Sequence, residues 1–545
     1  MTKSWKLPFA AACAALLASS PAFSQDNATA NLMTYGDAAG SGQAILSNLT
    51  PNSTTYLLVS LGETPANYFL RDTYGTGDND DYLSIVGPTP PFQAILNGTS
   101  TPGGQYTQPY VLPAVALDLK VYWQGFTLHP AQAGTAGMFQ DFTNVRVMTI
   151  NDHGRWQYTC TDFPTAGSNV ASAVMETGVN GLPTKLFVSG GGPALLTDEQ
   201  TPYPTNDQAW IYDAARETHT VAAGAPMTDS RAFHTCTALG DGTFLVCGGV
   251  QGPNGTGPYF SKVLNTAEVW DPVNGFQQVG NMGSYRAGHT ATLIESGIHA
   301  GKVLIAGGTE GNGAHELYGV DDLLTTALKS TELYDPVTQT FSAGPWMQEP
   351  KAGASALTMA NGEIIIAGGI TWTTIIFIKV PDFSDSAVFY DPTSNSFTYS
   401  RNLQHKRALF GMVERSNGDV VCAGGAGGDI LNIGPISSSE YFDLSSLSFV
   451  NIGQMGNNAA FPGAVVLPDD TVVILGGAQG DLDDPVPVNN VNILSPANVW
   501  TAGTPLQIEH AGGVAAYLED GTIYMGTGET GILNTSTEKS ETYTP

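Results

Sequence analysis

Positive charge is scarce in this chain. Its 545 residues include 20 Lys and Arg against 49 Asp and Glu, which gives a formal net charge of −29, and charged residues of both signs make up only 13% of the sequence. Such a surface repels nucleic acid and anionic lipid, so neither is expected as a partner. The same acidity favours solubility and would attract calcium or cationic partners.

Cysteine is also sparse, with five in the chain and no CxxC or Cys/His spacing of a zinc site. If Asp241 and Gly242 are the centre of a two-residue hairpin turn, Cys236 stands directly opposite Cys247. Opposed strand residues are close enough for a disulfide, which an exported protein permits. Two buried free thiols are the alternative, and the sequence leaves both open.

Long apolar runs are absent except at the N-terminus. Lys3 and Lys6 precede an apolar run over Leu7–Leu17, and Ala22–Ser24 offers a small-x-small cleavage site, so residues 1–24 are predicted to be a signal peptide. A membrane anchor needs roughly 20 apolar residues. We therefore expect a protein that does not span a membrane and is secreted, periplasmic or held at the cell surface.

Glycine is abundant, with 64 residues, and short Val- and Thr-rich segments alternate with turns, which predicts an all-β protein. Residues 25–150 carry strand-like runs such as Thr55–Leu61 and Lys120–Leu128, and a small β-sandwich is expected there. Within it the turn GDNDD offers three carboxylates for Ca²⁺, at Asp78, Asp80 and Asp81. Asp and Asn are also common turn residues, and no other cofactor is predicted.

From residue 151 onward one pattern recurs seven times, at intervals of 50–61 residues. An apolar run ends in paired glycines, and a motif with an aromatic residue and Asp-Pro follows. The junctions are LFVSGG (Gly190), FLVCGG (Gly248), VLIAGG (Gly307), IIIAGG (Gly368), VVCAGG (Gly424), VVILGG (Gly476) and IYMGTG (Gly526). The later motifs begin at Trp210, Glu268, Glu332, Val388, Glu440, Val491 and Glu541.

These residues resemble the kelch motif, and the chain is similar to exported bacterial kelch-repeat proteins, distantly related to galactose-oxidase-like propellers. The resemblance covers residues 151–545 and implies a seven-bladed β-propeller in which each repeat supplies strands a, b, c and d of one blade. The last repeat ends after its third strand. A strand near 154–160, with Trp156 at the position of the aromatic residue in other fourth strands, is expected to close it.

The b–c loops are long in several repeats, whereas the a–b and c–d turns are short, so one face of the propeller is the candidate binding face. Aligned first strands place five basic residues in one register, predicted as a ligand-binding ring at the channel mouth: Arg231, Arg286, Lys351, Arg407 and His510. Such a ring would attract an anionic ligand. Structural pairing within each blade is the alternative. Histidines three residues later, at His234 and His289, are interpreted as packing residues.

No assembled catalytic group is evident, so no catalytic residue is assigned. We expect an exported, non-catalytic binding protein that recognises a glycan or a surface protein through the long-loop face. The alternative is an enzyme resembling sugar mutarotases or, with less support, copper-radical oxidases. The latter use an adjacent Tyr-His pair, and the chain has no such dipeptide.

Overall fold

The computed structural model describes residues 156–545 except 160, 194–202, 253–261, 316–324, 376–377, 430–431, 482–484 and 532–534, together with eight earlier strands. The predicted signal peptide and the calcium candidates Asp78, Asp80 and Asp81 lie outside the described residues. In the described part, regular structure is almost entirely β, apart from one short 3-10 helix, η3 (Gly297–His299). No helix there is long and apolar enough to cross a membrane.

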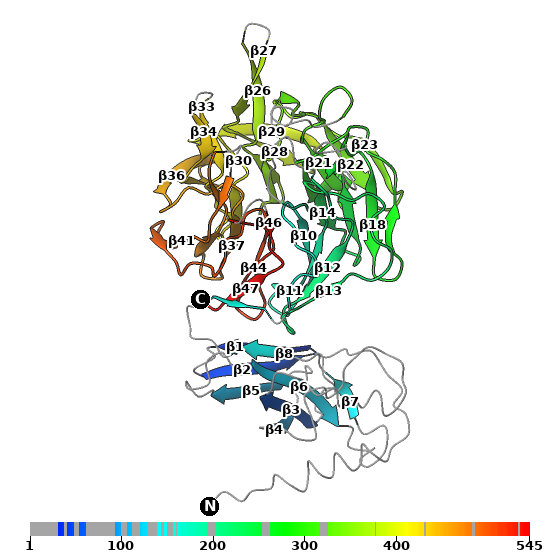
Figure 1. Ribbon diagram of the computed structural model, residues 1–545, viewed down its shortest axis with the longest axis vertical. Helices are drawn as coiled ribbons and strands as arrows, with labels where there is room; N and C mark the ends of the chain where they lie inside the picture. The colour runs from blue at the N-terminus through cyan, green and yellow to red at the C-terminus, as the bar shows by residue number, and fades with distance from the viewer. Residues whose placement is uncertain are drawn as a thin grey trace, which may run out of the picture.

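The eight early strands form two antiparallel sheets, grouped together in Figure 1. One has the order β1-β2-β5, and the other has the order β4-β3-β6-β7 with β8 also paired to β6. Their bounds are β1 (Asn31–Gly36), β2 (Ser41–Ser47), β3 (Thr54–Leu61), β4 (Gln93–Thr99), β5 (Tyr106–Val111), β6 (Lys120–Leu128), β7 (Phe139–Phe142) and β8 (Arg146–Thr149). The predicted runs Thr55–Leu61 and Lys120–Leu128 fall on β3 and β6.

The remainder contains seven four-stranded antiparallel sheets, numbered here 1 to 7 along the chain and arranged about a common centre in Figure 1. Sheet 1 is β10 (Ala171–Thr177), β11 (Pro183–Ser189), β12 (Ala209–Asp213) and β13 (Thr218–Val221). Sheet 2 is β14 (Thr235–Ala238), β15 (Phe244–Cys247), β18 (Ala267–Asp271) and β19 (Gly275–Gln278). Sheet 3 is β20 (Thr290–Leu293), β21 (Val303–Ala306), β22 (Thr331–Asp335) and β23 (Thr340–Ala343).

Sheet 4 is β24 (Ser355–Thr358), β25 (Ile364–Ala367), β28 (Ser386–Asp391) and β29 (Ser396–Asn402). Sheet 5 is β31 (Gly411–Glu414), β32 (Val420–Ala423), β35 (Ser438–Asp443) and β36 (Ser448–Gln454). Sheet 6 is β37 (Gly463–Val466), β38 (Val472–Leu475), β41 (Val491–Leu494) and β42 (Trp500–Ala502). The first strands of neighbouring sheets contact one another, so these strands are innermost.

Sheet 7 combines both ends of this region. Its strands are β43 (Val514–Tyr517), β44 (Ile523–Gly526), β47 (Ser540–Tyr543) and, as the fourth, β9 (Trp156–Tyr158). Trp156 pairs with Tyr543, their rings lie 5.0 Å apart, and the Trp156 indole nitrogen donates to the carbonyl of Thr504 at 2.9 Å. The outer edge of the last sheet is therefore supplied by the strand that precedes all the other strands of the seven sheets in sequence.

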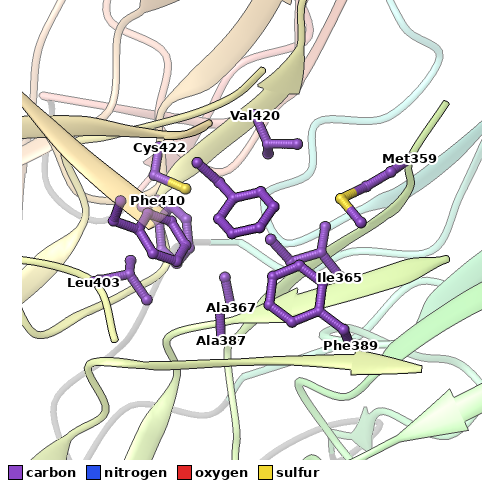
Figure 2. Close-up of a cluster of buried hydrophobic side chains, with 11 residues drawn as sticks. Met359, Ile365, Ala367, Ala387, Phe389, Leu403, Phe410, Val420 and Cys422 are labelled. Atoms are coloured by element: carbon purple, nitrogen blue, oxygen red, sulfur yellow. The ribbon is translucent and has the colours of Figure 1, made fainter. Parts of the chain in front are cut away.

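The apolar runs form the second strands, which are buried on both faces because a sheet packs against each side. All four residues of β21, Val303 to Ala306, are buried. Between sheets 4 and 5 the core contains stacked apolar side chains such as Ile365 and Phe389 from one sheet and Cys422 from the other (Figure 2). The core is thus a series of interfaces between adjacent sheets.

The paired glycines end the second strands for a steric reason. Gly307 and Gly308 have φ of 67° and 87°, and a Cβ on Gly307 would collide with the carbonyl oxygen of Lys351 in the next sheet. In sheet 7 the first glycine position is held by Thr527, with φ of 54°, and not by the predicted Gly526. The later motif of sheet 6 likewise aligns on Asn492 and not on Val491, because Asn492 pairs with Ile474 as Glu332 pairs with Ile305.

The second glycine position links each sheet to the next by one hydrogen bond, and the series returns to its start. Each backbone N–H donates to a carbonyl just before the next first strand, at 2.7–2.8 Å. The pairs are Gly191–Arg231, Gly249–Arg286, Gly308–Lys351, Gly369–Arg407, Gly425–Ala459, Gly477–His510 and Gly528–Gly167. The last pair joins sheet 7 to sheet 1.

Five of the b–c connections extend into small hairpins beyond the paired glycines. They are β16 (Val250–Gln251) with β17 (Lys262–Val263), β26 (Ile370–Ile375) with β27 (Ile378–Phe383), β33 (Ala426–Asp429) with β34 (Asn432–Pro435), β39 (Ala478–Gly480) with β40 (Pro485–Pro487), and β45 (Glu529–Thr530) with β46 (Thr535–Ser536). A short strand, β30 (Arg407–Ala408), also pairs with β33. The β26–β27 hairpin projects well beyond the sheets in Figure 1.

The predicted disulfide between Cys236 and Cys247 is wrong. Both are free cysteines, and Cys236 faces Val246 while Cys247 faces Thr235. The hairpin turn has three residues, since Leu239 N–H donates to the Thr243 carbonyl. One extra turn residue shifts the register by one, which places the two thiols on opposite faces of sheet 2.

Candidate functional site

The predicted basic ring consists of buried side chains that are paired inside their own sheets. Arg231 is fully buried, and its Nη1 donates to the carbonyls of Gly248 at 2.9 Å and Thr266 at 3.0 Å. Its Nη2 donates to Oε1 of Glu268 at 2.8 Å. The other oxygen of Glu268 accepts the backbone N–H of Thr228 at 2.8 Å. The ion pair therefore fastens the segment before the first strand of sheet 2 to the third strand of that sheet.

Sheets 3 and 5 repeat this arrangement. Arg286 binds the Gly307 carbonyl at 2.7 Å and Glu332 at 3.0 Å. Arg407 binds the Gly424 carbonyl at 2.7 Å and Glu440 at 2.8 Å. Burial lowers the pKa of Arg286, and the carboxylate of Glu332 opposes that effect. Each guanidinium thus has its charge balanced by a carboxylate and by backbone carbonyls.

Sheets 4 and 7 use other residues at the same position. Lys351 Nζ donates to the Gly368 carbonyl at 3.0 Å and to Glu349 at 2.9 Å, because Val388 stands where other sheets have glutamate. Burial lowers the pKa of Lys351, and Glu349 opposes that shift. His510 contacts the Thr527 carbonyl through Nδ1 at 2.6 Å and Glu541 through Nε2 at 3.3 Å.

These five residues are therefore structural clamps and present no charge to a ligand. The side chains of Arg231, Arg286, Lys351, Arg407 and His510 are all 0% exposed. Their proposed role in direct ligand contact is corrected by this burial. The alternative, pairing within each sheet, accounts for the register. Sheets 1 and 6 have neither the basic residue nor the glutamate. Sheet 1 has Gly167 and Trp210 at these two positions, and sheet 6 has Ala459 and Asn492.

His234 and His289 are also buried packing residues. His234 Nε2 lies 2.9 Å from Ser189 Oγ of sheet 1, and His289 Nε2 lies 3.0 Å from Thr235 Oγ1 of sheet 2. Each ring thus bridges to the preceding sheet. Burial lowers the pKa of His234 well below its usual value and that of His289 to about 3, with nearby arginines adding to both shifts. Both side chains are neutral at ordinary pH.

The centre of the loop face is a closed ring of backbone hydrogen bonds. We call it the central ring, and the loop face is the face that carries the b–c and d–a connections. In each sheet, the residue two positions before the first strand donates its backbone N–H to the carbonyl of the equivalent residue in the preceding sheet, at 2.7–3.1 Å. Its members are Asn169, Phe233, Gly288, Gly353, Leu409, Phe461 and Gly512. Asn169 donates to Gly512, which closes the circle.

All seven members have positive φ, between 52° and 65°. Glycine adopts this conformation freely and asparagine tolerates it, but for a bulky residue it costs about 1–2 kcal/mol. Phe233, Leu409 and Phe461 are therefore bulky side chains kept at positions where glycine would be less strained. Each is half-buried. Backbone strain of this kind often marks a functional position.

Sequence reasoning missed the central ring. Its members stand two residues after the basic position, as in RAF at Arg231 and RAG at Arg286. The signal was present, because this position is held by glycine in three repeats, by a large apolar residue in three and by asparagine in one. Nothing in a single repeat shows that the seven positions meet, since each bond joins different sheets.

Aromatic side chains stand beside the ring on the loop face. Tyr285 and His315 stack with ring centroids 3.8 Å apart, and Tyr285 packs on the same apolar cluster as Phe233. Trp372 of β26 packs on a second cluster together with Leu409 and Phe461. The base of the β26–β27 hairpin thus joins this second cluster. Two groups of large side chains therefore border the ring.

An exposed tryptophan lies farther along the same face. Trp346 is 65% exposed in the connection after sheet 3, and Lys329 Nζ lies 5.2 Å from the centre of its ring. Nothing in the structure explains why a tryptophan stands there. Within the described residues, no group of three or more His, Cys, Asp and Glu side chains is arranged to hold a metal ion.

Comparison with known proteins supports the fold. The sequence matches no protein-family model and no curated protein. A copper-bound fungal alcohol oxidase of the AA5 family is similar in structure, with a TM-score of 0.50 and 18% identity over 72% of this chain and 77% of the oxidase. The fold is a galactose-oxidase-like β-propeller. At this identity the likeness concerns the fold alone.

A second propeller-like neighbour is YjhT, at a TM-score of 0.40 and 14% identity, covering 70% of this chain and 95% of YjhT. That similarity is too weak to carry an argument.

Proposed function

We propose that residues 151–545 form a seven-bladed kelch-type β-propeller that follows a β-sandwich over residues 25–150 and a signal peptide over residues 1–24. Three features support the number of blades: seven sheets in chain order, the glycine hydrogen bonds that run from each sheet to the next, and the central ring. The β-sandwich is supported by the two early sheets. Export follows from the N-terminal sequence.

We further propose that the protein is a non-catalytic binding protein whose loop face recognises a glycan or an extracellular protein. The observation that carries this proposal is the location of the hairpins. All five extend b–c connections, so elaboration is concentrated on one face of a rigid ring. The five basic residues that were predicted to bind a ligand are instead buried in ion pairs and hydrogen bonds within the fold.

Two single substitutions, one on each face of sheet 3, test this proposal. Tyr285→Ala removes a half-buried aromatic from the loop face, and Val337→Ala removes a side chain that is 90% exposed in the c–d turn on the opposite face. Binding to a glycan array and to a panel of extracellular proteins is measured for the full chain. We expect Tyr285→Ala alone to weaken binding at least tenfold. Equal binding by both variants would contradict the assignment of the face.

The enzymatic alternatives are separate outcomes of the same study. Stoichiometric copper with oxidation of primary alcohols, or acceleration of sugar mutarotation, would overturn the non-catalytic proposal. Both assays need only the purified protein, metal analysis and small sugars. Neither outcome depends on the identity of the partner.

A further inference from the structure

One position near the start of the fourth strand holds Phe or Trp in six of the seven sheets and a histidine in sheet 1. The histidine is His219, which pairs with Tyr212 of the third strand. The equivalent residues of the other sheets, each paired in the same way, are Phe276, Phe341, Phe397, Phe449, Trp500 and Trp156. Sheet 1 thus has a ring that can take up a proton where the other sheets have one that cannot.

Side chains at this position pack against the preceding sheet. Phe276 of sheet 2 packs with Phe187 of sheet 1, and Phe449 of sheet 5 packs with Phe389 of sheet 4. For sheet 1 the preceding sheet is sheet 7, whose strands β44 and β47 lie beside β12 and β13 (Figure 1). His219 is 7% exposed and therefore lies buried at the junction where the circle of sheets closes.

A short segment after β9 crosses this junction. We call Thr159 and residues 161–163 the closing segment. Its N–H groups at Thr159 and Phe163 donate to the carbonyls of Ser540 at 3.0 Å and Glu538 at 2.7 Å, both in sheet 7 or directly before its third strand. Phe163 is 2% exposed, and its ring lies 4.2 Å from the ring of His219. The segment is thus anchored to sheet 7 by its backbone.

His219 joins the closing segment to both sheets. Its Nδ1 lies 2.8 Å from the carbonyl oxygen of Thr161, and its Nε2 lies 2.9 Å from the hydroxyl of Tyr524 and 3.3 Å from Ser540 Oγ. A carbonyl only accepts, so the neutral imidazole carries its proton on Nδ1 and accepts the Tyr524 hydroxyl through Nε2. Thr161 Oγ1 also accepts the backbone N–H of His219 at 2.7 Å.

The charged groups around His219 are paired with other residues. The carboxylate of Asp162, in the closing segment, lies 2.5 Å from Lys539 Nζ. Glu541 of β47 lies 3.3 Å from His510. Within the described residues, no carboxylate is hydrogen-bonded to the imidazole of His219. The other titratable groups on the elements packed here are Tyr212, Tyr524 and, in the turn before β13, Glu217.

A second proton on His219 is therefore disfavoured while the junction is closed. It would turn Nε2 into a donor facing the Tyr524 hydroxyl, which now donates to it. Burial lowers the pKa of His219 to about 4, although the Thr161 carbonyl and Asp162 oppose this shift. An imidazole in water binds its proton near pH 6.5. The closed form is thus fully favoured above about pH 6.5, and the open form gains about tenfold per pH unit as the pH falls towards 4.

We propose that the closing segment is an acid-sensitive closure of the circle of sheets: a proton on His219 releases the segment from sheet 1, while sheets 2 to 6 stay folded. This inference goes beyond the proposed binding function and does not depend on it. His234 and His289 are buried as well, but they directly precede the innermost strands of sheets 2 and 3. Exposing them requires those sheets to separate, whereas His219 is exposed when one short segment moves.

Two substitutions of His219 and one control test the proposal. His219→Phe places at this position the residue that four other sheets have there, so the fold accepts it. His219→Gln keeps an N–H group for the carbonyl of Thr161 but does not titrate in this pH range. His289→Ala is the control, because it removes a buried histidine whose ring bridges sheets 2 and 3.

Amide hydrogen exchange of the full chain, corrected for the intrinsic pH dependence of exchange, measures the opening. Peptides covering β9, the closing segment and β13 report on the junction, and peptides covering β21 and β25 report on global unfolding. At about pH 5 we expect the junction to exchange about tenfold or more faster than β21 and β25, with opening that rises about tenfold per pH unit below about pH 6. This rise should vanish in both His219 variants and persist in His289→Ala.

Equal exchange of the junction and of β21 and β25 at every pH would overturn the proposal, because acid would then act by global unfolding alone. Junction opening that is independent of pH, or that keeps its pH dependence in the His219 variants, would overturn it as well. If neither His219 variant folds, the comparison of the two regions in the parent protein and in His289→Ala still decides the matter.

Discussion

At the scale of single residues, the clamps are the most informative feature. A buried ion pair contributes little net stability, but removal of one partner leaves an uncompensated charge in the interior. The chain itself shows which neutral pair the fold accepts at this place, because sheet 6 has Ala459 and Asn492 there. Asn492 still accepts the Gly456 N–H at 3.1 Å, as the glutamates do in their sheets.

We therefore expect Arg231→Ala to destabilise the protein by about 3–5 kcal/mol, since Glu268 would remain buried without its partner. The double variant Arg231→Ala with Glu268→Asn should be more stable than Arg231→Ala alone, with a coupling of about 0.5–3 kcal/mol. Urea unfolding of the two single variants and the double variant measures both quantities. Additive single effects would show that the two side chains do not act as a pair.

The buried histidines predict a loss of stability in mild acid. The pKa of His289 is about 3 and that of His219 about 4 in the folded protein, in both cases mainly because burial disfavours the charged ring. The unfolded chain binds these protons near pH 6.5, so stability is complete above that pH and falls as the pH drops towards the folded values. The slope is about 1.4 kcal/mol per pH unit for each histidine.

Below about pH 6, His289→Ala should reduce this slope by about 1.4 kcal/mol per pH unit. Alanine is the natural residue at the equivalent position of sheet 4, at Ala354. Unfolding free energies at several pH values test this expectation, with Val337→Ala as a surface control. An unchanged slope would mean that His289 is protonated or exposed in solution.

At the scale of strands, the closing strand β9 gives the sharpest expectation. Trp156 is 5% exposed and packs on Tyr543, whereas Tyr158 of the same strand is 40% exposed. Trp156→Ala should cost about 3–5 kcal/mol and loosen the junction of sheets 6 and 7, where Trp156 is buried, while Tyr158→Ala should cost little. Melting temperature and the rate of proteolysis near residue 156 report on the two variants. Similar effects of both substitutions would argue against β9 as a latch.

Strands were easier to predict than the side of a strand on which a residue lies. The apolar runs before the glycines fall on buried second strands such as β21 and β25. The cysteine pair failed because it depended on whether one turn has two residues or three. Gly240 and Gly242 both have positive φ, which a two-residue turn around Asp241-Gly242 does not provide. One additional turn residue shifts the pairing of the two strands by one residue, so that side chains expected on the same face of the sheet lie on opposite faces.

At the scale of the whole molecule, the repeat predicted the class of fold but not the chemistry of its centre. The basic residues in one register suggested an anion-binding site, because sequence alone cannot show that Glu268, about 40 residues after Arg231, neutralises the charge of Arg231. The central ring was invisible for a related reason. Its seven bonds each join residues of different repeats, so no one repeat contains the pattern.

The central ring also sets a rule for the assembly of the chain. In a linear repeat protein the end units have one neighbour each, and copies can be added or lost at the ends with a roughly constant change in stability. Here Asn169 donates to Gly512, so the array has a periodic boundary and no end unit. Loss of any one repeat would break two ring bonds and force all the others to change their angle. The number of repeats is thus fixed by closure of the whole circle. Variants that lack part of the circle, or one repeat, should therefore not fold stably.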